Sequence, residues 1–254
     1  MFKKIFVIAK NTFKETIRDR ILYGILIFSV VFILSTVILG SLSLGEDAFV
    51  IKNFGLAGIY FFSLIITIFL GATLVYKEIE KKTIYFVLSK PVTTFNIILG
   101  KFIGLLASVA LITLIMTVVY SGITVYNGAT FDFLVFLPVL LQLCEMAILI
   151  AILIMLSIFL NPLAATIYTV LVVYAGHLSS LFLEYAQKSS GIIKFGLKTA
   201  YYIFPNLEKF NIRNMVAHSI KISGGEIVTS IIYACVYTAL VLYLAEMFFR
   251  RREL

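Results

Sequence analysis

The stretch KEIEKKTIYFVLSKPVTTFNIILGK, from Lys77 to Lys101, interrupts two long apolar runs and divides the chain. Charged residues at its start lead into an apolar turn that ends at Ser89-Lys90-Pro91. Because a proline disfavours helical geometry in the residue before it, the pattern predicts a short helix, a break and a new helix. A short helix between two membrane spans would transmit force to them if a partner bound it. The same charges also suit a solvated loop.

The composition indicates a membrane protein. Hydrophobic residues make up 61% of the 254 residues and only 13% are charged, whereas globular domains carry roughly 25% charged residues. The net charge of +8 does not indicate nucleic-acid binding, because the basic residues cluster beside apolar runs. Cys144 and Cys235 both lie within apolar runs, so they are interpreted as packing residues and not as a disulfide or a metal pair.

The apolar segments predict an all-α, polytopic membrane protein that forms a single domain over residues 1–254. A helix needs about 20 apolar residues to cross the hydrocarbon core. Residues 1–20 precede the first span and alternate apolar residues with lysines at helical spacing, which predicts an amphipathic helix at the membrane interface. The six predicted spans are residues 21–42, 54–76, 96–126, 133–160, 163–183 and 226–249.

The distribution of basic residues predicts the orientation. Segments 1–20, 77–101 and 250–254 hold 6, 5 and 3 Lys or Arg, whereas the links 43–53 and 127–132 hold 1 and 0. Cytoplasmic loops carry the excess of basic residues, so both termini are expected in the cytoplasm and the chain in the cell inner membrane. The segment 184–225 holds 6 basic residues on the opposite side, but long segments obey this rule poorly.

Three short motifs in the polar stretch resemble the first cytoplasmic loop of ABC-2 type ABC transporter permeases, most closely the NosY-like subgroup. They are the E-x-E-x-x-T of Glu78, Glu80 and Thr83, the LSKPVT that ends at Thr93, and the LGK that ends at Lys101. In that family the loop, here residues 77–95, carries a coupling helix that docks on a separate ATP-binding subunit. The resemblance implies that Glu78, Glu80, Lys81, Lys82, Thr83, Leu88 and Pro91 couple to that subunit.

The segment 184–225 carries a second resemblance. YYIFPNL, ending at Leu207, is similar to the P-N-L region before the last span of these permeases. Asn206 suits the N-cap of a helix that runs to about Ser219, and residues 192–204 form another amphipathic stretch. Two short helices at the outer leaflet would shape an outer gate or pack as a simple cap. Pro205, Asn206 and Leu207 are the outer-gate candidates.

Glu145 is the acidic residue that stands out within the spans, because it falls near the middle of the fourth. A carboxylate at that depth is costly, so a functional role is the default hypothesis. Gln142, one turn earlier, is a candidate on the same face. The alternative for Glu145 is a protonated or paired residue at a helix or subunit contact. His177 is interpreted as a packed, hydrogen-bonded residue.

An enzyme is not expected. Gly100-Lys101 lacks the upstream glycine and the following hydroxyl of a P-loop, and H-E-x-x-H and G-x-S-x-G do not occur in the sequence. With two His and two Cys, a metal site is not expected either. No catalytic residue or cofactor is therefore assigned to this chain, and ATP with Mg²⁺ would bind the partner subunit.

The resemblance implies the membrane subunit of an ATP-driven exporter. Its expected partners are two copies of an ABC ATP-binding subunit, a second permease copy and membrane lipid. Two alternatives remain open at this point. One is a non-transporting subunit that transmits ATP-driven force to an envelope assembly, and the other is an ion-gradient carrier with Glu145 as its proton site. The sequence does not identify the substrate.

Overall fold

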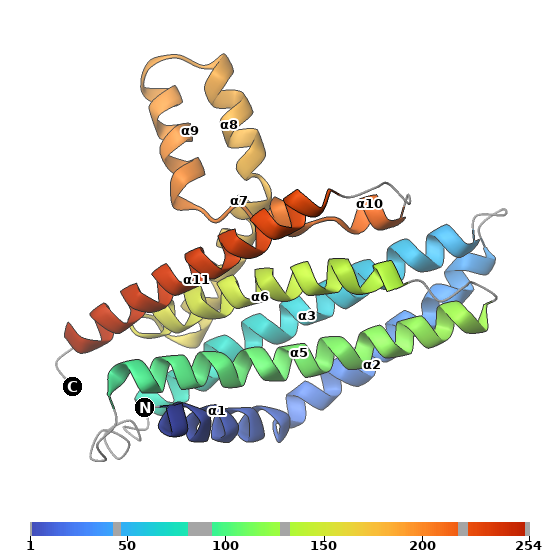
Figure 1. Ribbon diagram of the computed structural model, residues 1–254, viewed down its shortest axis with the longest axis horizontal. Helices are drawn as coiled ribbons and strands as arrows, with labels where there is room; N and C mark the ends of the chain where they lie inside the picture. Colours follow the sequence, from blue (N-terminus) through green and yellow to red (C-terminus); the bar gives the residue numbers. More distant parts are fainter. Residues whose placement is uncertain (1, 43–46, 81–92, 128–132, 218–222, 252–254) are drawn as a thin grey trace.

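The computed structural model describes residues 2–42, 47–80, 93–127, 133–217 and 223–251. Helices make up 91% of the structure, and no strand occurs within these ranges. The long helices form one bundle, and a short helical hairpin projects from its side (Figure 1). The helices are α1 (Phe2–Ile17), α2 (Arg20–Ser41), α3 (Asp47–Glu80), α5 (Thr94–Tyr126), α6 (Phe136–Ser157), α7 (Pro162–His177), α8 (Ser179–Lys188), α9 (Gly191–Ile203), α10 (Arg213–Ala217) and α11 (Gly224–Arg251), with 3₁₀ turns η1 (Phe133–Val135) and η2 (Glu208–Phe210).

Five of the described helices are long and apolar enough to cross a membrane, and a sixth span results if α7 and α8 are counted together. The two helices meet at a bend of 56° after His177. By itself α7 extends about 24 Å, which is short of the roughly 30 Å hydrocarbon core. The predicted fifth span, residues 163–183, corresponds to α7 and the first part of α8 with this bend between them, whereas α2, α5, α6 and α11 follow their predicted spans closely.

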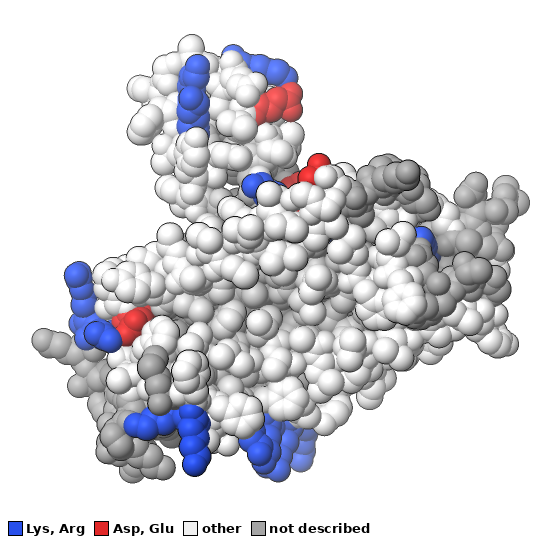
Figure 2. All heavy atoms as spheres, viewed as in Figure 1, with Lys and Arg blue, Asp and Glu red and all other residues white. Residues whose placement is uncertain are grey.

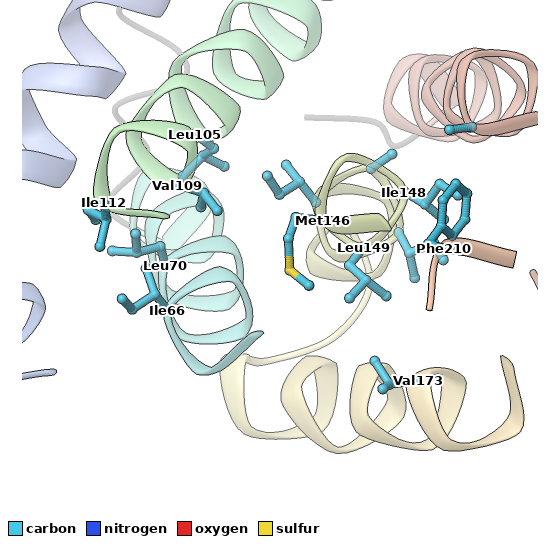
Figure 3. Close-up of a cluster of buried hydrophobic side chains, with 14 of the residues drawn as sticks. Ile66, Leu70, Leu105, Val109, Ile112, Met146, Ile148, Leu149, Val173 and Phe210 are labelled. Carbon is cyan, nitrogen blue, oxygen red and sulfur yellow. The ribbon is translucent and has the colours of Figure 1, made fainter. Parts of the chain in front are cut away.

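The core of the bundle lies between α3, α5 and α6. Ile148, Leu149 and Ala151 of α6 are fully buried. Figure 3 shows Met146 and Leu149 of α6 between residues of α3 and α5 on one side and Val173 and Phe210 on the other. Most of α6 is covered by other helices, and its open face would meet lipid, which explains why α6 shows little separation of polar and apolar faces.

The N-terminal helix α1 packs against the first half of α5. Ile5, Ala9 and Thr12 are buried there, whereas Phe2 and Phe6 are 86% and 69% exposed. Residues 2–17 thus form the predicted helix, but its buried face includes threonines and leaves out two of its phenylalanines. The exposed aromatic edge beside exposed lysines suits the membrane interface.

Gly104 allows the close approach of α1 to α5, and its substitution gives a test of this contact. A Cβ at Gly104 would lie 2.6 Å from the carbonyl oxygen of Ala9 and 2.7 Å from Cβ of Thr12. We expect Gly104→Ala to destabilise the chain by about 1–2 kcal/mol, because overpacking outweighs the gain in helix propensity. Gly122→Ala is the matched control, since a Cβ there meets nothing within 4 Å. Equal melting temperatures of the two variants in detergent would contradict the expected contact.

Charged residues lie at the ends of the bundle and on the hairpin of α8 and α9. In Figure 2 the middle of the visible face is uncharged, and Lys and Arg gather near α1, at the end of α11 and on the hairpin. Helix α9 buries no residue: Ile192, Phe195 and Tyr202 are 90%, 73% and 78% exposed. The hairpin therefore presents an amphipathic face that this chain does not cover.

Candidate functional site

Residues 205–217 fold back onto the end of α7, and Gly176 allows this contact. The amide of Leu207 donates to the carbonyl oxygen of Gly176 at 3.2 Å. A Cβ at Gly176 would lie 2.7 Å from the carbonyl oxygen of Pro205 and 2.7 Å from Cγ of Leu207. Docking of this segment at Gly176 accounts for the end of α7 at His177 and for the bend that follows.

Glu145 lies where α3, α6 and α7 meet, and it is 1% exposed. The hydroxyl of Tyr60 donates to Glu145 Oε1 at 2.8 Å. His177 Nε2 lies 3.1 Å from the same oxygen and 2.7 Å from Tyr60 Oη. Three polar atoms from three helices thus form a closed triangle inside the bundle.

The other ring nitrogen of His177 faces a second carboxylate. His177 Nδ1 lies 3.0 Å from Glu208 Oε2, and Asn211 Nδ2 donates to Glu208 Oε1 at 3.2 Å. The side chain of Glu208 is 44% exposed, that of His177 is 22% exposed and that of Glu145 is 2% exposed. One imidazole therefore connects a partly solvated carboxylate to a buried one.

Arg213 of α10 supplies the positive charge of the site. Its guanidinium carbon lies 3.7 Å from the centroid of the Tyr60 ring, and Nε donates to Asn211 Oδ1 at 3.1 Å. This is a cation–π contact. Burial lowers the pKa of the Arg213 guanidinium, while the nearby Tyr60, Glu145 and Glu208 oppose that shift. Arginine stays charged in proteins, so the guanidinium offsets one of the two carboxylates.

We call Tyr60, Glu145, His177, Glu208 and Arg213 the polar cluster. Its members come from α3, α6, α7, η2 and α10, so the cluster joins the bundle to the segment 184–225. Sequence reasoning had singled out Glu145 as an ionisable group inside a span and treated His177 as a packed residue. It missed Tyr60, Glu208 and Arg213 as site residues. A tyrosine among apolar residues, and an arginine close before the last span, were the available signals.

Gln142 is buried beside the cluster and faces α3, where its Nε2 donates to the carbonyl oxygen of Ile59 at 3.4 Å. The structure thus pairs Glu145 with Tyr60 and His177. Gln142 of α6 contacts Ile59, the residue before Tyr60 on α3. Whether either side chain acts in transport stays a prediction.

The gate candidates lie in an irregular segment. Asn206 does not cap a helix: its backbone N–H donates to Tyr233 Oη at 2.9 Å, and Leu207 is the residue that precedes the turn η2. Up to residue 217, where the described part of this segment ends, only η2 and the short α10 follow. The predicted helix from Asn206 to about Ser219 is therefore wrong. Leu207 is fully buried and Phe210 is 2% exposed. Burial of these two side chains bends the segment onto the bundle, which a continuous surface helix would not allow.

Only part of the predicted coupling loop lies within the described residues. Helix α3 continues without a break through Glu78 and Glu80, so these two residues extend the helix of the second span. Thr93 precedes α5 as its N-cap residue. The other candidates, Lys81, Lys82, Thr83, Leu88 and Pro91, lie outside the described residues.

An apolar groove of about 590 Å³ lies between α5, α6 and α11. Cys144 and Cys235 lie on its wall as free thiols, the first half-buried and the second exposed. Ala147, Ala234 and Ala239 are among the small side chains that line the hollow.

Comparison with known proteins assigns the family. A family model described as ABC-2 family transporter protein matches residues 6–254, which is nearly the whole chain. No curated protein matches the sequence. The matched range includes all spans and the whole polar cluster. The chain therefore belongs to the ABC-2 transporter family, as a membrane permease subunit that works with an ABC ATP-binding subunit and is not itself the ATPase.

Proposed function

We propose that the protein is a NosY-like exporter permease of the cell inner membrane, with both termini in the cytoplasm. It works as a homodimer with two ATP-binding subunits that carry ATP and Mg²⁺. In this orientation residues 77–95 face the ATP-binding subunits and residues 184–225 lie on the outer side. The distribution of basic residues supports the orientation. The family assignment favours an ATP-driven permease over an ion-gradient carrier.

The continuity of α3 is the observation that carries this proposal. Tyr60 of the polar cluster and Glu80 at the predicted coupling loop lie on one unbroken helix. Their separation corresponds to about 30 Å at 1.5 Å per residue. Because a helix moves as a rod, closure of the ATP-binding subunits against this loop would shift Tyr60 relative to Glu145 and His177. The cluster then acts as a latch that holds the segment 184–225 closed.

Pro205 and Leu207 are the outer-gate residues in this mechanism. Both contact Gly176 at the end of α7. Separation of Glu208 from His177 would release them together with η2 and α10, because they belong to the same short segment. The predicted gate thus opens by undocking from α7, and it closes again when the cluster re-forms.

Charge reversal at Glu80 tests the coupling part of the proposal. We expect Glu80→Lys to weaken binding of the ATP-binding subunit by at least about tenfold and to uncouple ATP hydrolysis from transport, because it places a like charge at a complementary interface. The measurements are the amount of co-purified ATPase and the ATP hydrolysis rate of the complex. Glu184→Lys, at an exposed position of α8, is the control. Unchanged association in Glu80→Lys would argue against docking at this loop.

The function itself is tested by purification of the tagged chain from its native membrane in mild detergent. A P-loop ATPase in a stoichiometric amount is the expected result, and neighbouring proteins would then narrow the substrate. A chain that comes out intact and alone would contradict the proposed complex.

A second candidate is a permease-like subunit that transmits force to an envelope assembly. The observation that favours it is the hairpin of α8 and α9, whose exposed Ile192, Phe195 and Tyr202 suit an extracytoplasmic partner. Recovery of a partner with a large extracytoplasmic domain, together with an absence of ATP-dependent flux, would support this candidate over an exporter.

A further inference from the structure

We propose that the polar cluster is a proton-binding site, in which one proton is shared between Glu145 and His177 and exchanges with the aqueous side through Glu208. Two points rest on the proposed function: that this aqueous side is the outer side of the membrane, and that the proton is linked to gating. The proton count and the path follow from the geometry of the cluster alone.

The number of hydrogens in the cluster supports this proton: with either tautomer of a neutral imidazole and both carboxylates ionised, one of the two short contacts between His177 and a carboxylate lacks a hydrogen. A neutral imidazole has a single N–H, and an ionised carboxylate only accepts. If that N–H lies on Nδ1 and faces Glu208, then Nε2 is a bare lone pair at 3.1 Å from Glu145 Oε1 and 2.7 Å from Tyr60 Oη. The hydroxyl hydrogen of Tyr60 would then be the only hydrogen available for the three contacts of the triangle. One additional proton, on Nε2 or on Glu145, removes the clash between two acceptors.

The net charge of the cluster also indicates one additional proton. The charged and titratable groups that face His177 are Tyr60 from α3, Glu145 from α6 and Glu208 from η2, with Arg213 of α10 stacked over Tyr60. With a neutral imidazole and both carboxylates ionised, the cluster has a net charge of −1. One proton brings it to zero. Uncompensated charge is costly at a buried position in a membrane protein, so the protonated cluster is the stable closed form.

The exposure of the side chains provides a path for exchange. A proton that reaches Glu208 Oε2 can pass to Nδ1 of His177 while the ring gives its Nε2 proton to Glu145 Oε1. This step starts from the tautomer with its N–H on Nε2: the Glu208 O–H and Nε2–H bonds break while the Nδ1–H and Glu145 O–H bonds form. The proton moves from the partly solvated carboxyl group to the buried one, and the negative charge moves from Glu145 to Glu208. The imidazole connects the two carboxylates directly, at 3.0 Å and 3.1 Å.

The path ends at Glu145. Ile148 and Leu149, one turn further along α6, are fully buried and apolar, and Ile152 is 5% exposed. Figure 3 shows Ile148, Leu149 and Val173 packed in this part of the core. Among the described residues of α6, the next polar side chain is Ser157 at its end. Along α6 the path therefore ends at Glu145, and the buried hydroxyls of Ser63 and Thr67 on α3 are paired with Thr113 and with Met146 Sδ.

The test uses the full chain labelled with ¹⁵N-histidine in detergent. The sequence holds two histidines, so His218→Gln leaves His177 as the single reporter. A charged imidazole gives two similar ¹⁵N shifts, and a neutral ring gives two widely separated ones. We expect a shared proton over the lower part of the range between about pH 5 and 8. It appears as a charged His177 or as an infrared carboxylic-acid band that is lost in Glu145→Gln.

Variants of the two carboxylates make the assignment specific. We expect Glu145→Gln and Glu208→Gln each to release the proton of His177 at a pH lower by about one unit or more, because each removes an opposite charge. Glu184→Gln is the control, since its exposed carboxylate pairs with Lys188 on α8. A neutral His177 with no Glu145 acid band across the range would overturn the proposal. Where His177 is charged, a titration that is the same in all variants would also overturn it. Because this measurement needs no ATPase, its result is independent of the co-purification experiment.

Discussion

Glu145→Ala should destabilise the folded chain by about 2–4 kcal/mol, a larger loss than for the other substitutions considered above. The substitution removes the acceptor of Tyr60 Oη and the neighbour of His177 Nε2, and it leaves both groups buried inside the bundle. Tyr60 Oη and His177 Nε2 lie 2.7 Å apart and keep each other as partners, so the loss comes from the two contacts to the carboxylate and from the cavity that it leaves. The measurement is the unfolding midpoint in a detergent titration, followed by a signal for tertiary structure.

Two comparison variants separate the lost partner from the lost volume. Glu145→Gln keeps an oxygen that accepts from Tyr60, so we expect a loss of about 1 kcal/mol, in the range of hydrogen bonds measured between membrane helices. Glu184→Ala removes an exposed carboxylate that pairs with Lys188, and it should leave the midpoint unchanged. If Glu145→Ala and Glu184→Ala have the same unfolding midpoint, the cluster does not stabilise the bundle.

The spans were predictable because hydrophobicity over about 20 residues decides membrane insertion. Helices α5 and α11 match the predicted segments to within two residues at each end. The break after α7 was not predictable, because residues 163–183 are mostly apolar and the cause lies elsewhere in the chain. Leu207 and Pro205 dock on Gly176, and a local pattern contains no information about that contact.

The site was predictable only in part for the same reason. Glu145 is visible in the sequence as a costly charge within a span. Its partners Tyr60 and His177 lie 85 and 32 residues away, which matches no helical period. The motif around Asn206 was misleading, because Pro-Asn suits a helix start whereas burial of Leu207 and Phe210 determines the actual path.

The second large effect that we expect is an opening of the latch as pH rises. The protonated cluster is neutral and fully hydrogen-bonded, so the closed state binds the shared proton more tightly than the open state does. The closed state is therefore favoured at low pH, and its advantage is lost as pH rises through the value at which the closed cluster releases the proton. One proton changes the equilibrium by at most about tenfold per pH unit, or about 1.4 kcal/mol.

Distances between spin labels report this opening. Cysteines introduced at Lys198 of α9 and Tyr126 at the end of α5 are suitable sites, because both side chains are exposed. The native thiols are first removed by Cys144→Ala and Cys235→Ala. We expect one narrow distance distribution at low pH and a second, separate population that grows at high pH.

The variant His177→Gln tests whether the imidazole is the group that makes the opening depend on pH. This variant cannot take up the proton at the ring, so its distances should no longer depend on pH, whereas Glu184→Gln should behave like the parent chain. Growth of the closed population with rising pH would contradict the sign of the effect.

In sealed vesicles the pH of each side can be changed separately. A rise in pH should then open the latch only on the side that Glu208 faces, since Glu208 is the partly exposed carboxylate of the path and Glu145 is buried. A response to the cytoplasmic side alone would show that the segment 184–225 lies there, and would reverse the proposed orientation.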